Sequence, residues 1–238
     1  MKTATLPSLR VDPELREAAE SVLQEGESLS GFIEASVRET ILRRRVRAEF
    51  LARGLASREE AKRTGAYVDA EVVHAQLAKK LADESIDVMI CNAGVYGPRS
   101  DGLTDMPTED FDLVMRTNVL GPLRLTLAFA HNVARARGAM VFLSSRMGSI
   151  GTMSSSSGIA YRASKAALNA VVKATSLELG KKGVRVMALH PGWVRTDMGG
   201  PQASLTPTES VAGMRHVIEN ASDKHGGFFD NTGATIPW

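Results

Sequence analysis

The sequence predicts an α/β fold in which a parallel sheet with flanking helices follows a mostly helical module. From Ile86 onward, short apolar runs alternate with stretches of helical periodicity, which is the pattern of a parallel sheet. Residues 1–82 instead hold four of the 21 glycines together with ten arginines, and their pattern is helical. We therefore expect two modules, 1–82 and 84–238, with a boundary near Asp83–Ser85.

The composition is that of an ordinary globular protein. In 238 residues, 43% are apolar and 24% charged, and a net charge of +2 excludes a strongly basic coat for nucleic acid. The single cysteine, Cys91, excludes an intrachain disulfide and a cysteine-ligated zinc site, so we expect no metal site and interpret Cys91 as a buried strand residue. With no run of 18 apolar residues and no signal-peptide core, the expected protein is cytoplasmic and makes no membrane contact.

The first module predicts one short strand followed by three helices. Asp12 followed by Pro13 is typical of a helix start, and Gly26 is typical of a helix end. Ser28 is the expected cap of the second helix, which ends in the basic run Arg43–Arg47. The expected elements are a strand over 3–11 and helices over 13–24, 28–47 and 69–82.

Residues 1–50 resemble the ribbon-helix-helix fold in the order and lengths of these elements. So short a unit normally needs a partner chain to enclose a core, which favours a homodimer or a larger assembly. The resemblance implies DNA binding, with Ser8 and Arg10 facing base edges and Ser28 at a phosphate. Residues 54–82 are similar to the arm with which small antitoxins bind a RelE/ParE-type toxin. A solvated surface role for Arg10 is the alternative.

The second module predicts strands separated by helices. The expected strands are 86–91, 139–144 and 184–190, with 227–229 as a candidate for a short last strand. The expected helices are 108–132, 158–181 and 208–221. Apart from Asp87, the run 86–91 is apolar, as in a strand that is buried on both faces.

Polar residues in this module fit proton transfer. Tyr161 and Lys165 are four residues apart on an expected helix and therefore share a face. A tyrosine pKa of about 10 is too high for proton transfer at neutral pH. A neighbouring lysine cation favours the phenolate and lowers that pKa. Ser145, with Ser144 beside it, is placed to hold a substrate oxygen, and Asn118 to anchor a water that relays protons to the lysine.

Five motifs occur in a fixed order along this module. They are Asn92-Ala93-Gly94, Asn118, Ser145, Tyr161-Arg-Ala-Ser-Lys165 and Pro191-Gly192-Trp-Val-Arg-Thr196. With them, residues 84–238 resemble the short-chain dehydrogenase/reductase family, and SSRMGSI, AYRASKAALN, HPGWVRTDM and the closing IPW are similar to its C-factor and sniffer-like carbonyl reductases. The resemblance implies a Rossmann-like sheet and hydride transfer between NAD or NADP and a small carbonyl or alcohol substrate.

The resemblance also implies a role for each matching residue. Tyr161 is the implied catalytic acid/base, and Lys165 lowers its pKa and binds the nicotinamide ribose. Ser145 orients the carbonyl, and Asn118 supports the proton relay. The implied cofactor-binding residues are Asn92, Ala93, Gly94, Tyr161, Lys165, Pro191, Gly192, Val194 and Thr196.

The glycine-rich turn that would hold the cofactor's pyrophosphate has no counterpart upstream of Asn92. The sequence therefore predicts a partial Rossmann-like sheet, in which 86–91 becomes an apolar edge that invites pairing. We expect weak cofactor binding and, as a result, little unaided activity. The alternative hypothesis is a dimeric, DNA-binding, antitoxin-like regulator fused, naturally or by engineering, to an inactive dehydrogenase fragment.

Overall fold

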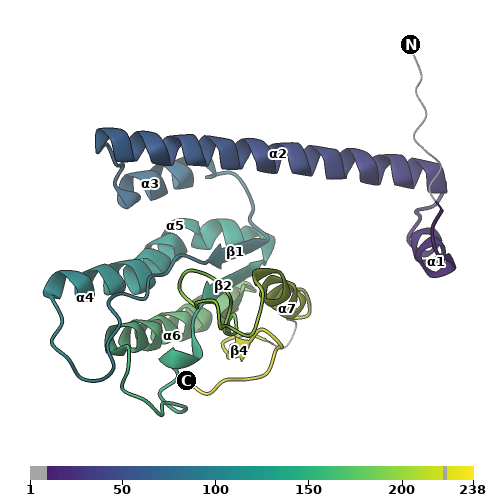
Figure 1. Cartoon of the computed structure of the whole chain (residues 1–238). Coiled ribbons are helices and arrows are strands. Elements are labelled where there is room, and N and C mark those ends of the chain that lie inside the picture. The colour runs from purple at the N-terminus through teal and green to yellow at the C-terminus, as the bar shows by residue number, and fades with distance from the viewer. Residues whose placement is uncertain (1–9, 222–223) are drawn as a thin grey trace. The chain divides into compact units, whose positions relative to one another are not determined.

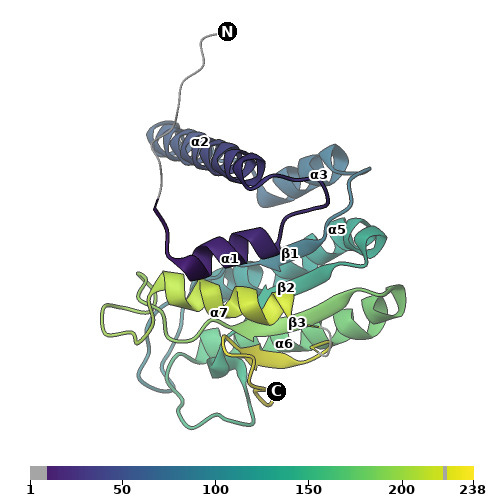
Figure 2. The same cartoon turned by 90° about the vertical axis from the view of Figure 1, so that its right-hand side faces the viewer.

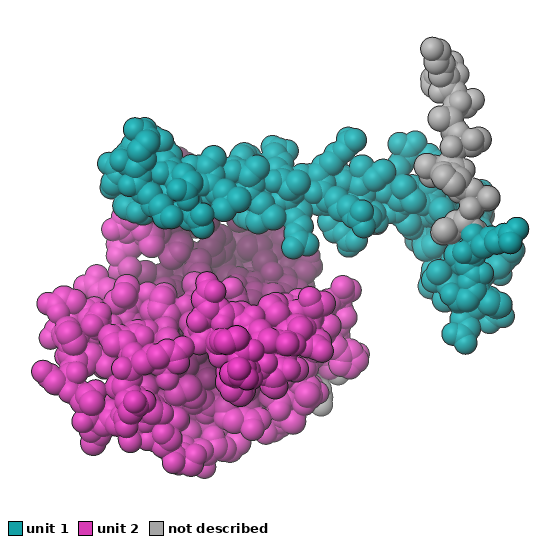
Figure 3. Space-filling view, in the orientation of Figure 1, with its two compact units in different colours: residues 1–68 teal, residues 69–238 magenta. Residues whose placement is uncertain are grey.

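The computed structural model describes residues 10–221 and 224–238 (Figure 1). The chain divides into two compact units, residues 1–68 and 69–238 (Figure 3). This division lies upstream of the expected boundary near 83–85 because helix α3 (Ala70–Lys80) packs against helix α5 (Gly121–Ala136) of the second unit. None of the described helices is long and apolar enough to span a bilayer.

The first unit contains two exposed helices that begin at the predicted cap residues. They are α1 (Pro13–Ser21) and α2 (Leu29–Thr64). The Asp12 side chain caps α1 by accepting a hydrogen bond from the Leu15 N–H at 2.8 Å. Ser28 caps α2 in the same way, accepting from the Gly31 N–H at 3.1 Å. Neither helix contains a buried residue.

The ribbon-helix-helix module expected over 1–82 is not confirmed. Nearly all of its strand, including Ser8, lies outside the described residues, and Arg10 is exposed and outside regular secondary structure. The second helix was expected to end at Arg43–Arg47, but α2 continues for 36 residues to Thr64. Residues 48–63 are mostly Ala, Leu, Glu, Arg and Lys, which are strong helix formers and carry the chain past Gly54.

The second unit is built on a parallel sheet of four strands in the order β1-β2-β3-β4 (Figure 2). The strands are β1 (Val88–Cys91), β2 (Ala139–Leu143), β3 (Arg185–His190) and β4 (Phe228–Asp230). In their register, Ile90 lies beside Val141, and Val141 lies beside Met187. The predicted α/β fold with a parallel sheet and flanking helices is confirmed.

The helices of this unit match the predicted order along the chain. The expected helix over 108–132 forms as three consecutive segments, α4 (Thr108–Met115), the π-helical turn η1 (Arg116–Leu120) and α5. The other long helices are α6 (Ile159–Leu179) and α7 (Pro207–Glu219). Two short 3₁₀ turns, η2 (Arg146–Gly148) and η3 (Gly180–Lys182), follow β2 and α6.

Two apolar cores cover the two faces of the sheet. Because successive strand residues point to opposite faces, neighbours in one strand belong to different cores. On one face, Phe142 packs against Leu168 and Val172 of α6, and α5 covers the same side. On the other face, Val141 packs in a core with Val217 of α7. The unit is therefore a sheet between two helical layers (Figure 2).

Strand β1 forms an edge of the sheet in the described part of the chain, as the sequence predicted. Its Val88 and Ile90 side chains are 45% and 50% exposed. The core beneath α7 is made by residues of β2, β3 and β4, so it does not extend over these two side chains. The outer strand therefore presents apolar surface that the second unit leaves uncovered.

Candidate active site

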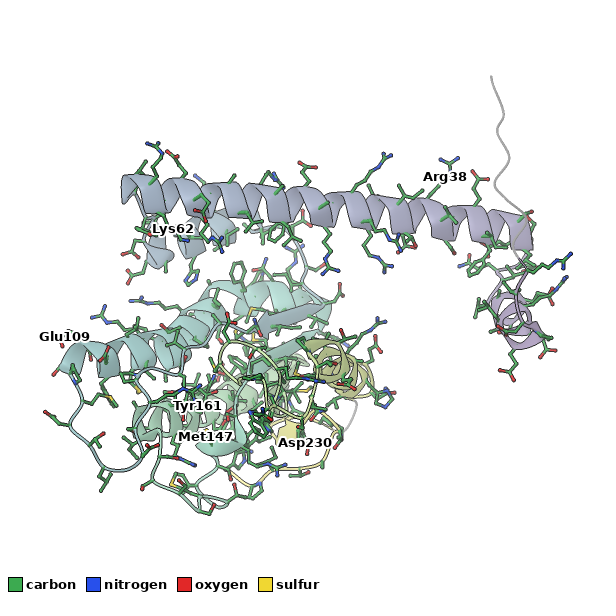
Figure 4. All side chains as sticks on the ribbon, in the orientation of Figure 1. Arg38, Lys62, Glu109, Met147, Tyr161 and Asp230 are labelled. Carbon is green, nitrogen blue, oxygen red and sulfur yellow. The ribbon has the colours of Figure 1, made fainter. Side chains whose placement is uncertain are left out.

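The carboxyl ends of β1, β2 and β3 bring the polar motifs of the sequence to one edge of the sheet. In open parallel sheets, this is the edge at which ligands bind. A cavity of about 560 Å³ opens there, and its lining includes Ser145 after β2, Tyr161 of α6 and Thr196 after β3 (Tyr161 is labelled in Figure 4). The predicted residues that line the cavity are Ser145, Tyr161, Pro191, Gly192, Val194 and Thr196.

Tyr161 and Lys165 lie one turn apart on the same face of α6, as predicted. The Tyr161 side chain is only 8% exposed, and its ring stacks on the Tyr96 ring with 4.7 Å between centroids. The Lys165 Nζ lies 5.6 Å from the centroid of the Tyr161 ring. It also donates a hydrogen bond to the Leu143 carbonyl at 2.7 Å, which ties α6 to the end of β2.

The pKa of Tyr161 is shifted upward, whereas a downward shift was expected. Burial is the main cause, and it raises the pKa of Tyr161 above its usual value, while a hydrogen bond with the Ser145 side chain lowers it. The lysine was expected to bring this pKa down. However, burial also weakens the charged form of Lys165 and lowers its pKa to about 8. Ser145, rather than Lys165, therefore opposes the effect of burial on the tyrosine.

The two serines after β2 have different surroundings. The Ser145 hydroxyl interacts with Tyr161 and also accepts a hydrogen bond from the Met147 N–H at 3.2 Å. The Ser144 hydroxyl donates to Asn169 Oδ1 at 2.6 Å, deep within the unit. Ser145 is therefore the serine that can reach a substrate oxygen beside the tyrosine, and Ser144 holds the loop to α6.

Asn118 is fully buried and lies in the π-helical turn η1, a distortion that often occurs at functional sites. Its Oδ1 accepts from the Val95 N–H at 2.8 Å. Its Nδ2 donates to the Val95 carbonyl at 2.8 Å and to Ser164 Oγ at 2.9 Å. The side chain thus holds the segment after β1 against α6. Both Nδ2 donors of the amide and one acceptor position of Oδ1 are engaged in these three bonds.

The nicotinamide end of a dinucleotide fits these residues. A Cβ at Gly94 would lie 3.4 Å from both Asn118 Oδ1 and Lys165 Nζ, so the glycine leaves open space beside the lysine. Gly192 has a left-handed φ of +84°, which turns the chain after β3 toward the cavity. Asn92 and Ala93 are exposed directly after β1. Among the described residues, no group of three or more metal-ligating side chains gathers.

The residues expected to bind DNA do not take part in this site. Ser8 lies outside the described residues, and Arg10 is exposed. The Ser28 hydroxyl is engaged as the cap of α2. DNA and toxin binding therefore stay predictions for the first unit.

Tyr96, Arg99 and Arg162 are among the cavity residues that the sequence prediction missed. Tyr96 supports the Tyr161 ring, and Arg99 lies 5.3 Å above the Tyr96 ring while donating to the Met198 carbonyl at 3.1 Å. No sequence signal marks the Tyr96–Tyr161 contact or the Arg99–Met198 bond, because the partners of each are far apart along the chain. Arg162 also lines the cavity, and its position next to Tyr161 was the available signal.

Comparison with known proteins identifies relatives over most of the chain. A model of the short chain dehydrogenase family matches residues 39–205. The chain is 43% identical to C-signal of Myxococcus xanthus over 155 residues, which is 64% of this chain and 93% of that protein. It is similar to the structure of carbonyl reductase Sniffer of D. melanogaster, at 27% identity and a TM-score of 0.66, covering 76% of this chain and 82% of that one.

A second carbonyl reductase of known structure is also similar to this chain. The NADPH-bound carbonyl reductase from chicken fatty liver is 32% identical, with a TM-score of 0.62 over 71% of this chain and 72% of that one. The family match begins at residue 39, within α2, and so includes much of the region expected to be antitoxin-like. The antitoxin alternative and the expectation of little activity are therefore not supported.

Proposed function

Because the chain belongs to the short-chain dehydrogenase family, we propose that it transfers a hydride between NAD or NADP and a small carbonyl or alcohol substrate. The observation that carries this proposal is the meeting of Tyr161, Ser145 and Lys165 at the carboxyl edge of the sheet. When bound, the nicotinamide supplies or accepts the hydride. The chain's own residues bind the substrate oxygen and move its proton.

Tyr161 is the proposed acid in the direction of reduction. Its hydroxyl donates a proton to the carbonyl oxygen as negative charge develops there, and it takes the proton back in the oxidation of an alcohol. Ser145 donates a hydrogen bond to the same oxygen and thereby fixes its distance from the tyrosine. The Lys165 ammonium, 5.6 Å from the centroid of the Tyr161 ring, is the proposed counter-charge for the phenolate that forms only after the proton has left.

Lys165 is also the proposed contact for the nicotinamide ribose, with Gly94 providing room beside its Nζ. The chain from Pro191 to Thr196 runs along the cavity and is the proposed binding segment for the nicotinamide ring. The hydrogen bond from Lys165 Nζ to the Leu143 carbonyl holds the ammonium in one position and so limits the movement of the lysine side chain.

Replacement of the tyrosine tests this proposal. In Tyr161→Phe we expect the rate of carbonyl reduction, followed as consumption of NADPH or NADH, to fall about 10²- to 10⁴-fold, the range that general acid catalysis contributes. Cofactor affinity and the circular-dichroism spectrum should be retained. Tyr67→Phe is the matched control, because Tyr67 is exposed and belongs to the first unit. A wild-type rate in Tyr161→Phe would refute the proposed mechanism.

A further inference from the structure

The charged residues that line the cavity beside Tyr161 are predominantly positive. Of the described residues that line it, three are arginines and none is an aspartate or glutamate. The arginines are Arg99, Arg146 and Arg162. His190 lines it as well, but burial lowers the pKa of His190 to about 4, so that imidazole is neutral at physiological pH. A cavity with this lining favours an anion.

Arg162 is the buried member of the three arginines. Its side chain is 9% exposed, and its Nε donates one hydrogen bond to the Ser157 carbonyl at 2.7 Å. A guanidinium has five N–H donors, so the four on the two Nη atoms are left for another partner. None of the ion pairs among the described residues includes Arg162.

The position of Arg162 makes this arrangement costly for the free protein. A charge that is largely buried and has no counter-ion is solvated less well than one on the surface, which costs some stability. Arg162 is also the fourth residue of α6, near the helix N-terminus, where the helix dipole is positive and a cation is unfavourable. An incoming anion would relieve both penalties at once, because the dipole and the guanidinium attract it together.

The other two arginines are held by the protein and lie nearer to solvent. Arg99 is engaged with the Met198 carbonyl and the Tyr96 ring. Arg146 is 59% exposed and contacts Asp230 at 3.4 Å (Asp230 is labelled in Figure 4). Water and salt screen exposed charges, so among the three arginines Arg162 should attract an anion most strongly.

We infer that the substrate is a carbonyl compound that carries a carboxylate, and that Arg162 binds this carboxylate while Tyr161 and Ser145 bind the carbonyl oxygen. The inference rests on the proposed function. Arg162 and Tyr161 both line this cavity, so a molecule that occupies it can contact both side chains. The planar guanidinium matches a carboxylate with two parallel hydrogen bonds, which gives direction as well as affinity.

Paired acids and esters test this inference. The substrates are phenylglyoxylate and 4-carboxybenzaldehyde, each compared with its methyl ester, so that the carboxylate lies at two distances from the carbonyl. In the wild type we expect kcat/KM to favour at least one acid over its ester by about 10- to 100-fold, the effect of one charge-assisted contact. In Arg162→Gln this ratio should fall close to one. Equal ratios in both proteins would overturn the inference.

Two further variants make the comparison specific. Arg162→Lys keeps a cation but loses the planar pair of N–H donors, so this variant should still prefer the acid over the ester several-fold. If Arg162→Gln does not fold, the comparison of Arg162→Lys with the wild type serves as the test. Arg135→Gln removes the same charge from an exposed position of α5 away from the cavity, and should keep the wild-type ratio. A loss of preference in Arg135→Gln equal to that in Arg162→Gln would assign the effect to net charge and overturn the inference.

Binding measurements separate this inference from the proposed function. Trp193 lines the cavity, so its fluorescence should report the binding of benzoate, and benzamide is the neutral comparison. Benzoate binding that is lost in Arg162→Gln, without turnover of any carbonyl compound, would support the anion site and contradict the proposed function. A tenfold loss of NADPH affinity in Arg162→Gln would instead assign the arginine to the cofactor phosphates and overturn the inference.

Discussion

Gly148 is the position where the smallest possible side chain should disturb the site most. It is the last residue of η2, shortly after Ser145, and it lies against the backbone of α6. A Cβ there would stand 2.6 Å from both the carbonyl carbon and the Cβ of Lys165. Carbon atoms pack at about 3.5–4.0 Å, so an alanine has to push the two segments apart by about 1 Å.

The expected cost of Gly148→Ala has two parts. Forcing an extra methyl group into a packed interior costs about 1–3 kcal/mol of unfolding free energy. The same displacement moves the loop that carries Ser145 away from the helix that carries Tyr161 and Lys165. A misplacement of about 1 Å at a catalytic group can lower a rate by about 100-fold.

Urea unfolding and steady-state kinetics measure the two parts separately. With a urea m-value of about 1–3 kcal/mol/M, we expect the midpoint of Gly148→Ala to fall by roughly 1 M. Gly102→Ala is the matched control, because a Cβ at Gly102 meets no atom within 4 Å, and its midpoint and rate should be those of the wild type. A Gly148→Ala protein with an unchanged midpoint and an unchanged rate would refute the packing argument.

Two further outcomes follow from the buried ionisable groups. Because burial lowers the pKa of Lys165 to about 8, the ammonium is lost as pH rises through that value, so the rate of reduction should fall there. Lys165→Arg stays charged, so the activity that this variant retains should not fall over the same pH range. A wild-type rate that increases through this pH would contradict the role of the ammonium. Burial raises the pKa of Cys91 to about 12, so a disulfide reagent should label it only in urea, and fast labelling of the folded chain would contradict its placement.

The catalytic edge was predictable because its signals are local. Short apolar runs followed directly by polar motifs predicted where β1, β2 and β3 lie along the chain, and parallel strands bring their carboxyl ends to one edge of a sheet. The four-residue spacing of Tyr161 and Lys165 likewise fixed their common face. Each of these inferences needed only neighbouring residues and the geometry of one element.

The remaining features depend on contacts between distant segments or on a balance of small energies. The antitoxin-like arm was expected to begin at Gly54, yet a glycine costs a helix only about 1 kcal/mol, which the surrounding helix formers outweigh in α2. The direction of the Tyr161 pKa shift depends on burial, which the sequence does not disclose. The π-helical turn at Asn118 likewise serves bonds to Val95 and Ser164, which lie 23 and 46 residues away.

The proton-transfer geometry is a property of the second unit alone. Asn118 links the segment after β1 to α6 through Ser164, and Lys165 links α6 to the end of β2 through the Leu143 carbonyl. Asn169 of α6 accepts from Ser144 and also donates to the Gly148 carbonyl at 3.2 Å, which holds the loop that carries Ser145. These bonds join η1, α6, the end of β2 and the segments that follow β1 and β2, and every partner lies between residues 69 and 238. Substitutions on the exposed surface of α1 and α2 should therefore leave the catalytic rate unchanged. Replacement of either buried amide side chain, Asn118 or Asn169, should lower it.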